Sequence, residues 1–132
     1  MKITLKLLFT LFIFLSSNFV KSQNFENFEK QITKEWRLKS YETNGKKHPP
    51  KPGHESDKMI FTEDHKTNSI TKGISRIGTW KFDKENGILS IVDDVLQFEI
   101  ILNVISYADN NCVLELENPE KQKTRIYLVS KK

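Results

Sequence analysis

From Trp36 onward the sequence breaks into short runs in which apolar and polar residues alternate, with Gly, Asn, Asp or Pro between the runs. Short runs rich in β-branched and aromatic residues are typical of strands with one buried face. No long helical periodicity remains after Trp36. The pattern predicts eight strands, at residues 36–43, 58–62, 68–71, 76–83, 88–92, 96–107, 112–117 and 124–130.

Most links between these runs are short, which favours antiparallel neighbours because a parallel crossover needs a dozen or more residues. Alternation places Phe98, Ile100 and Leu102 on one face of their strand and Gln97 and Glu99 on the other. An open sheet with one apolar face would expose too much apolar surface. We therefore expect an all-β fold, a small antiparallel up-and-down barrel of about eight strands.

Two links differ from the rest. Residues 44–57 hold three of the four prolines and no apolar side chain suited to burial, so we expect them to form a surface loop. Lys72-Gly73 is either a tight turn or a bulge within one longer strand, which leaves the strand count open by one.

A short helix is expected before the first strand. Phe25, Phe28, Ile32 and Trp36 follow one another at steps of three and four residues, which places them on one side of a helix. Residues 23–35 are therefore predicted to form a lead-in helical segment. Its apolar stripe would dock against the barrel.

Residues 1–22 have the parts of a secretory signal peptide. Lys2 and Lys6 precede an apolar run at residues 7–15, and polar residues follow it. A run of nine residues is too short to cross a bilayer, which needs about 20. We therefore expect a protein that is exported and then periplasmic or secreted, with no membrane span in the mature chain.

Small Ser22 before Gln23 favours cleavage at that bond. Phe19 and Val20 extend the apolar run, so an uncleaved anchor is the alternative. No cysteine stands near the end of the leader, and a lipid-modified cysteine is therefore not expected.

The formal charge of +4 lies mostly in the leader. Without residues 1–22 the chain has 18 Lys and Arg against 17 Asp and Glu, which leaves +1. This charge does not favour a nucleic-acid partner. Cys112 is the only cysteine, so no disulfide can form within one chain.

Several sequence segments resemble the short lipocalin-like (calycin) proteins that bacteria secrete. The segments are Lys34-Glu35-Trp36-Arg37-Leu38, Asn44-Gly45-Lys46, Gly78-Thr79-Trp80, Phe98-Glu99-Ile100 and Leu114-Glu115-Leu116. The resemblance implies that residues 36–132 form a lipocalin-like β-barrel domain. It also implies binding of a small apolar molecule, as is common in the wider group.

In the classical lipocalins the Trp of the first strand packs beneath an Arg from the last strand. Trp36 and Arg125 occupy comparable places, so the resemblance implies that these two side chains meet. Strand parity places Arg125 on the face opposite Ile126 and Leu128. An exposed Arg125 is the reading we favour.

Side chains with catalytic or metal-binding chemistry do not form a recognisable motif. His48, His54, Glu55 and Asp57 are close in sequence, but their spacing matches no standard metal site and their loop is Pro-rich. Cys112 begins an apolar alternation, which favours an inert buried thiol. We expect no enzyme activity, no metal and no cofactor.

An eight-stranded barrel is either filled by its own side chains or just wide enough for one small ligand. An apolar pocket would open near the loop at residues 44–57, and a fatty or isoprenoid-like ligand would suit it. The alternative is a filled structural or protein-interaction barrel with no small-molecule ligand and an unknown protein partner. The candidate ligand-binding residues are Phe61, Trp80, Phe82, Phe98, Ile100 and Leu114.

Overall fold

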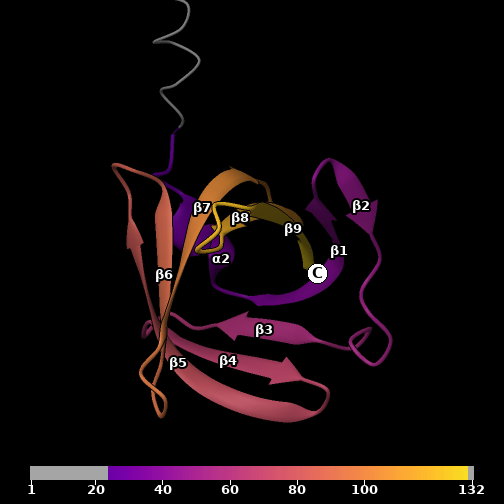
Figure 1. The fold of residues 1–132 in the computed structure, drawn as a ribbon. Helices are drawn as coiled ribbons and strands as arrows, with labels where there is room; N and C mark the ends of the chain where they lie inside the picture. The colour runs from indigo at the N-terminus through magenta and orange to yellow at the C-terminus, as the bar shows by residue number, and fades with distance from the viewer. Residues whose placement is uncertain (1–23, 131–132) are drawn as a thin grey trace, which may run out of the picture.

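The computed structural model describes residues 24–130, and the predicted signal peptide, residues 1–22, lies outside the described residues. The described chain forms one short helix and nine strands in a single antiparallel sheet (Figure 1). The elements are α2 (Phe28–Ile32), β1 (Glu35–Thr43), β2 (Lys46–His48), β3 (Lys58–Phe61), β4 (Lys66–Thr71), β5 (Ile74–Asp83), β6 (Ile88–Asp93), β7 (Glu99–Tyr107), β8 (Asn111–Glu117) and β9 (Lys123–Ser130).

Eight of these strands close into a barrel. Each strand from β3 to β8 pairs with the next one along the chain. The last strand, β9, pairs with β1 from Trp36↔Ser130 to Thr43↔Thr124. β1 also pairs with β3, so the ring is complete. The predicted all-β antiparallel barrel with a short N-terminal helix is confirmed.

The main differences from the sequence-based prediction are three. The helix is shorter than the predicted segment 23–35, because Thr33 and Lys34 leave the helix and Trp36 already belongs to β1. Residues 44–57 contain the additional strand β2. Strand β7 starts at Glu99, not at residue 96, and a turn precedes it. Of the two alternatives for Lys72-Gly73, the structure shows the tight turn, in which both residues have positive φ.

The barrel wall is incomplete between β1 and β3. Only three residue pairs join these strands, from Glu35↔Ile60 to Arg37↔Lys58. Beyond them β1 bulges between Leu38 and Ser40 and takes β2 as its neighbour instead. The interior is therefore less well covered at this point of the wall.

Helix α2 closes one end of the barrel. Phe28 is fully buried, and its ring lies 4.3 Å from that of Phe82 and 5.3 Å from that of Tyr107. The Trp36 indole Nε1 donates a hydrogen bond of 2.9 Å to the Ile32 carbonyl. The helix thus joins β5 and β7, the two strands that flank β6 in the barrel wall.

A layer of large side chains fills the barrel next to the helix. Trp80 and Phe61 meet edge to face with ring centres 5.9 Å apart, and Trp80 Nε1 donates to the Thr62 carbonyl. Each fully buried side chain of this kind stabilises the fold by about 1.5–3 kcal/mol. This layer needs no ligand to be stable. Its most buried members are Trp36, Phe61, Trp80, Leu89, Cys112 and Leu114.

Candidate functional site

Beyond the aromatic layer several inward positions of β4 and β5 carry small residues. On β4 the inward side chains are Thr67, Ser69 and Thr71. On β5 the inward position two residues before Trp80 is Gly78. A Cβ at Gly78 would lie 2.7 Å from the Thr67 hydroxyl oxygen, so only glycine fits there. Small side chains on two neighbouring strands leave space at the end of the barrel opposite α2.

This space is a pocket of about 370 Å³. Known small-molecule sites have volumes of about 300–1,000 Å³, so the pocket lies near the lower end of that range. Most of its wall is apolar, and side chains from β3, β5, β6 and β7 contribute. The apolar lining residues are Met59, Ile74, Ile77, Ile91, Phe98 and Ile100.

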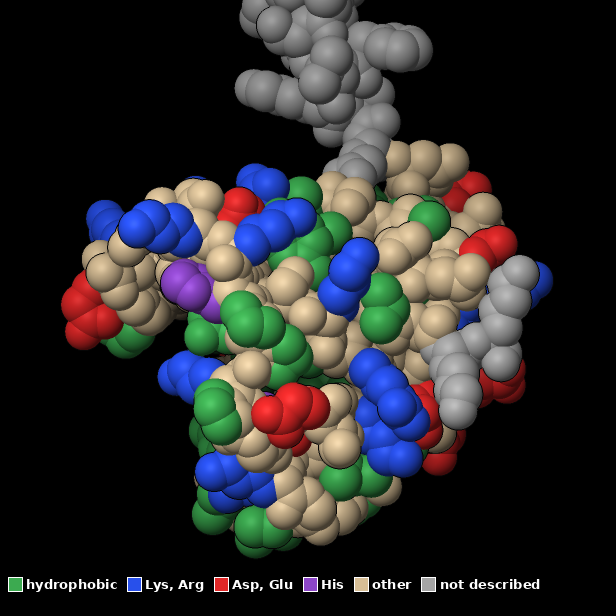
Figure 2. Space-filling model, turned by 90° about the vertical axis from the view of Figure 1, so that its right-hand side faces the viewer, with side chains coloured by type: hydrophobic (Ala, Val, Ile, Leu, Met, Phe, Trp, Pro, Cys, Tyr) green, Lys and Arg blue, Asp and Glu red, His purple; other side chains and the backbone are tan. Residues whose placement is uncertain are grey.

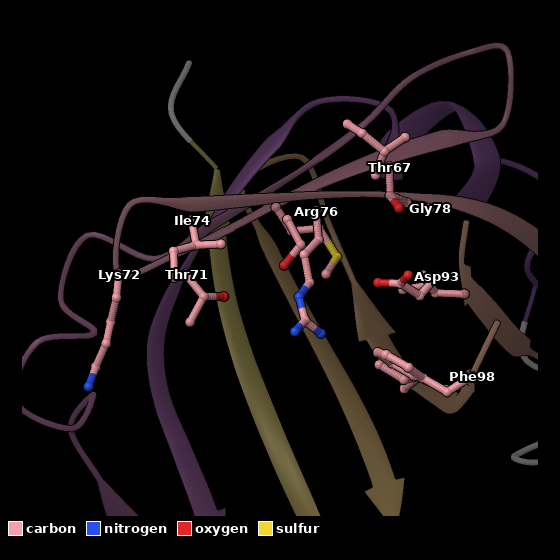
Figure 3. Close-up of a pocket in the computed structure, with 13 residues that line it drawn as sticks. Thr67, Thr71, Lys72, Ile74, Arg76, Gly78, Asp93 and Phe98 are labelled. Atoms are coloured by element: carbon pink, nitrogen blue, oxygen red, sulfur yellow. The ribbon is translucent and has the colours of Figure 1, made fainter. Parts of the chain in front are cut away.

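Arg76 brings a positive charge to this apolar pocket from an exposed position at its mouth. It occupies the same inward series on β5 as Gly78 and Trp80, and its guanidinium extends into the pocket between Thr71 and Phe98 (Figure 3). Within residues 24–130 its side chain makes no hydrogen bond and no ion pair. A guanidinium is charged at every physiological pH, so its donors are free for a ligand.

Asp93 also lines the pocket, but its carboxylate is already engaged. Oδ1 accepts hydrogen bonds from the backbone N–H of Val95, at 2.9 Å, and of Leu96, at 2.7 Å. The residue is 8% exposed. From the last position of β6, Asp93 thus fixes the turn between β6 and β7.

A second, smaller pocket of about 160 Å³ adjoins the first at the incomplete wall between β1 and β3. The two share Met59, Ser69 and Thr71, so the interior extends sideways. Asp57, the last residue of the predicted loop 44–57, lines the smaller pocket and accepts a hydrogen bond from the Lys72 N–H at 3.0 Å. The rest of this loop lines neither pocket.

Two of the six candidate ligand-binding residues, Phe98 and Ile100, line the larger pocket. Phe61, Trp80 and Leu114 are packed in the aromatic layer with 1–2% of their surface exposed. Phe82 is partly buried and packs against Phe25 and Phe28 below the helix. The structure therefore brings only Phe98, just before β7, and Ile100 of β7 to the pocket.

The small inward residues of β4 and β5, which create the pocket, were not among those predicted from the sequence. The signal was present in Lys66–Thr71, where the alternate positions are small hydroxyl residues and not large apolar ones. The inward series of β5 gave a second signal, since Gly78 and Arg76 precede Trp80 near the start of the strand.

The histidines of the predicted loop have separate partners. His54 Nδ1 lies 2.7 Å from Asp57 Oδ2, whereas the His48 ring stacks on Tyr41 with centres 5.3 Å apart. In the part of the chain that the structure describes, no group of three or more His, Cys, Asp or Glu residues is arranged to hold a metal ion.

Trp36 and Arg125 do not meet. Arg125 is exposed and donates from Nε to Glu115 at 3.1 Å, as strand parity predicts. The cation near the Trp36 ring is Lys34, whose Nζ lies 5.6 Å from the ring centre. The pairing that the lipocalin resemblance implied is therefore replaced by a cation from the segment just before β1.

The thiol of Cys112 is 1% exposed, and burial raises its pKa to about 12. Below about pH 8.5 the thiol is neutral in both the folded and the unfolded chain and contributes nothing to pH dependence. Above that pH the unfolded chain releases a proton that the folded chain retains. The free energy of unfolding therefore falls as pH rises, by about 1–2 kcal/mol at about pH 10.

Urea unfolding of the wild type and of Cys112→Ala at about pH 8 and about pH 10 measures this contribution. The variant is less stable at both pH values, because it leaves a cavity, but it should lose less stability between them. Equal losses in the two proteins would show that the thiol does not stay protonated in the fold.

Comparison with models of known protein families and with curated proteins finds no match. No helix among residues 24–130 is long and apolar enough to cross a membrane.

Proposed function

We propose that the protein is an exported, lipocalin-like, non-catalytic barrel that binds a small amphipathic anion in the pocket at its open end. The observation that carries the proposal is the unpaired guanidinium of Arg76, an exposed residue that lines the mouth of a largely apolar pocket. A ligand with one negative head group and an apolar tail complements both properties of the site.

The head group would bind Arg76. A carboxylate can accept two parallel hydrogen bonds from a guanidinium, and such charge-assisted bonds are about twice as strong as neutral ones. Asp93 does not compete for this role, because its Oδ1 is held by the backbone of the following turn. The tail would lie against Met59, Ile91 and Ile100, deeper in the barrel.

The volume and lining limit the ligand class. About 370 Å³ suits a medium-chain monocarboxylate or a compound of similar size. A sugar or nucleotide would leave hydroxyl and base edges facing apolar side chains, which costs free energy for every unpaired polar group. The ligand that we propose therefore differs from the purely apolar one expected from the sequence, because it has an anionic end.

Export and the lipocalin-like assignment are supported by different features. The Lys-flanked apolar run at residues 7–15 supports export. The closed barrel of antiparallel strands is the architecture that the lipocalin-like resemblance implies.

We assign the pocket no catalytic role. The hydroxyl groups that line it belong to Thr67, Ser69 and Thr71, whereas the imidazoles of His54 and His65 bond to Asp57 and to the Trp80 carbonyl. A hydroxyl nucleophile requires a base within hydrogen-bond reach.

Calorimetric titration with decanoate, decanol and decylamine tests the proposal. Decanoate should bind best, and Arg76→Gln should weaken its binding about 10–100-fold, since hydrogen bonds to a charged group contribute about 1.5–3 kcal/mol. Decanol binding should change little. Arg37→Gln, an exposed arginine of β1 that pairs with Glu35, is the matched control.

Equal decanoate affinity of the wild type and Arg76→Gln contradicts the assigned head-group site. Failure of all three compounds to bind favours the filled structural or protein-interaction barrel, for which the complete aromatic layer is the supporting observation.

A further inference from the structure

The turn between β6 and β7 carries two apolar side chains at its tip. Val95 and Leu96 are 83% and 60% exposed. Tips of turns usually carry Gly, Asn, Asp or Ser. The turn is also well ordered by hydrogen bonds, because Asp93 Oδ1 accepts from both residues and Gln97 Nε2 donates to the Asp94 carbonyl at 2.8 Å. The fold thus holds two apolar side chains in solvent.

These side chains continue an apolar rim around the mouth of the pocket. Ile74, Ile77 and Phe98 are exposed and also line the pocket. The Asp94 N–H donates to the Ile77 carbonyl at 3.0 Å, which fastens the turn to β5. Figure 2 shows hydrophobic side chains gathered at the lower end of the molecule, with Lys and Arg side chains beside them. Exposed apolar patches of this kind mark interaction sites.

The charges at this end favour an anionic partner. The side chains of Lys72 and Arg76 make no ion pair within the described residues. Of the nearby acids, Asp57 bonds to His54 and to the Lys72 N–H, and Asp94 bonds to Thr79 and Lys66. Asp93 Oδ1 accepts from the backbone N–H groups of Val95 and Leu96. Glu99, next to Phe98, lies exposed on the outer face of β7.

We propose that the open end of the barrel docks on an anionic lipid surface, with Val95 and Leu96 inserted among the acyl chains and Lys72 and Arg76 at the head groups. A protruding apolar tip flanked by cations matches a lipid interface, where apolar burial and attraction to anionic lipids act together. A flat or concave patch would suit a protein partner better. The proposal rests on the proposed function only in that the pocket would take its ligand directly from the lipid.

Cosedimentation with vesicles tests the docking, using the chain from Gln23 onward, which keeps every described helix and strand. Binding is expected to vesicles of phosphatidylcholine with phosphatidylglycerol, and it should be weaker with phosphatidylcholine alone or at high salt. The affinity of the double variant V95D/L96D for these vesicles should be at least about tenfold lower than that of the wild type. Ile101→Asp is the matched control, because Ile101 is half exposed on the outer face of β7 and away from the turn.

A tryptophan at the tip reports insertion. The emission of Leu96→Trp should shift to the blue with the anionic vesicles, whereas native Trp36 and Trp80, 1% and 2% exposed, should not respond. Absence of wild-type binding to both vesicle types overturns the proposal. So does equal binding by V95D/L96D, or a wild-type dimer that V95D/L96D dissociates, which would mean that a second copy covers the rim.

Decanoate titration without vesicles separates the two proposals. V95D/L96D should bind decanoate within a few fold of the wild type, because neither residue lines the pocket and the added exposed carboxylates act on the ligand only through screened repulsion. Docking without decanoate binding overturns the proposed function alone. Decanoate binding without docking overturns the lipid surface alone.

Discussion

Replacing Trp80 by Ala is expected to lower the free energy of unfolding by about 3–5 kcal/mol. Trp80 is 2% exposed at the centre of the filled layer. Its ring packs against Phe61 on one side and stacks on His65, with ring centres 4.3 Å apart, on the other. The substitution leaves a cavity that β-strands on all sides of the barrel cannot collapse to fill.

Urea unfolding followed by circular dichroism measures this loss. Lys81→Ala is the matched control on the same strand, because Lys81 points outward and is exposed. Its effect should stay within about 0.5 kcal/mol. A loss of less than about 1 kcal/mol for Trp80→Ala would mean that the aromatic layer does not support the barrel.

Replacing Ser69 by Phe is expected to reduce decanoate affinity about 100-fold or more, the largest effect on binding that we predict. Ser69 is an inward residue of β4 and lines both pockets, so a ring at this position occupies the space where they join. The ring would contact Met59 and other apolar side chains already present. The variant should therefore fold with little change in stability.

Calorimetric titration of decanoate checks this prediction, with Ser69→Thr as the control that keeps the hydroxyl and adds only a methyl group. Ser69→Thr should bind decanoate within a few fold of the wild type. Unchanged affinity in Ser69→Phe would place the ligand elsewhere on the molecule.

Most strands could be predicted because alternation and turn residues are local properties of the sequence. The exception, β2, consists of Lys46, Lys47 and His48 and has no apolar alternation. It forms because Asn44 and Gly45 take positive φ and fold the chain back onto the end of β1. Asn-Gly is a strong hairpin signal, but the polar residues after it gave no sign of a strand.

The position of the pocket could not be predicted from alternation alone. Alternation shows which side chains point inward, and it did so for Trp80 and Ile100 alike. It does not show how far along the barrel axis each one lies. That depth depends on the registers between strands, such as Gly78↔Asp93 and Ile91↔Ile100, which long-range pairing determines.

The central claim is that the open end of the barrel is a ligand site. Amide chemical shifts recorded by NMR during titration with decanoate test it most directly. We predict that the shift changes concentrate around the pocket, at Ser69, Thr71, Gly78 and Ile100, and that Ser69→Phe abolishes them. Changes centred on α2 or on the outer face of the barrel, or no changes at all, would contradict it.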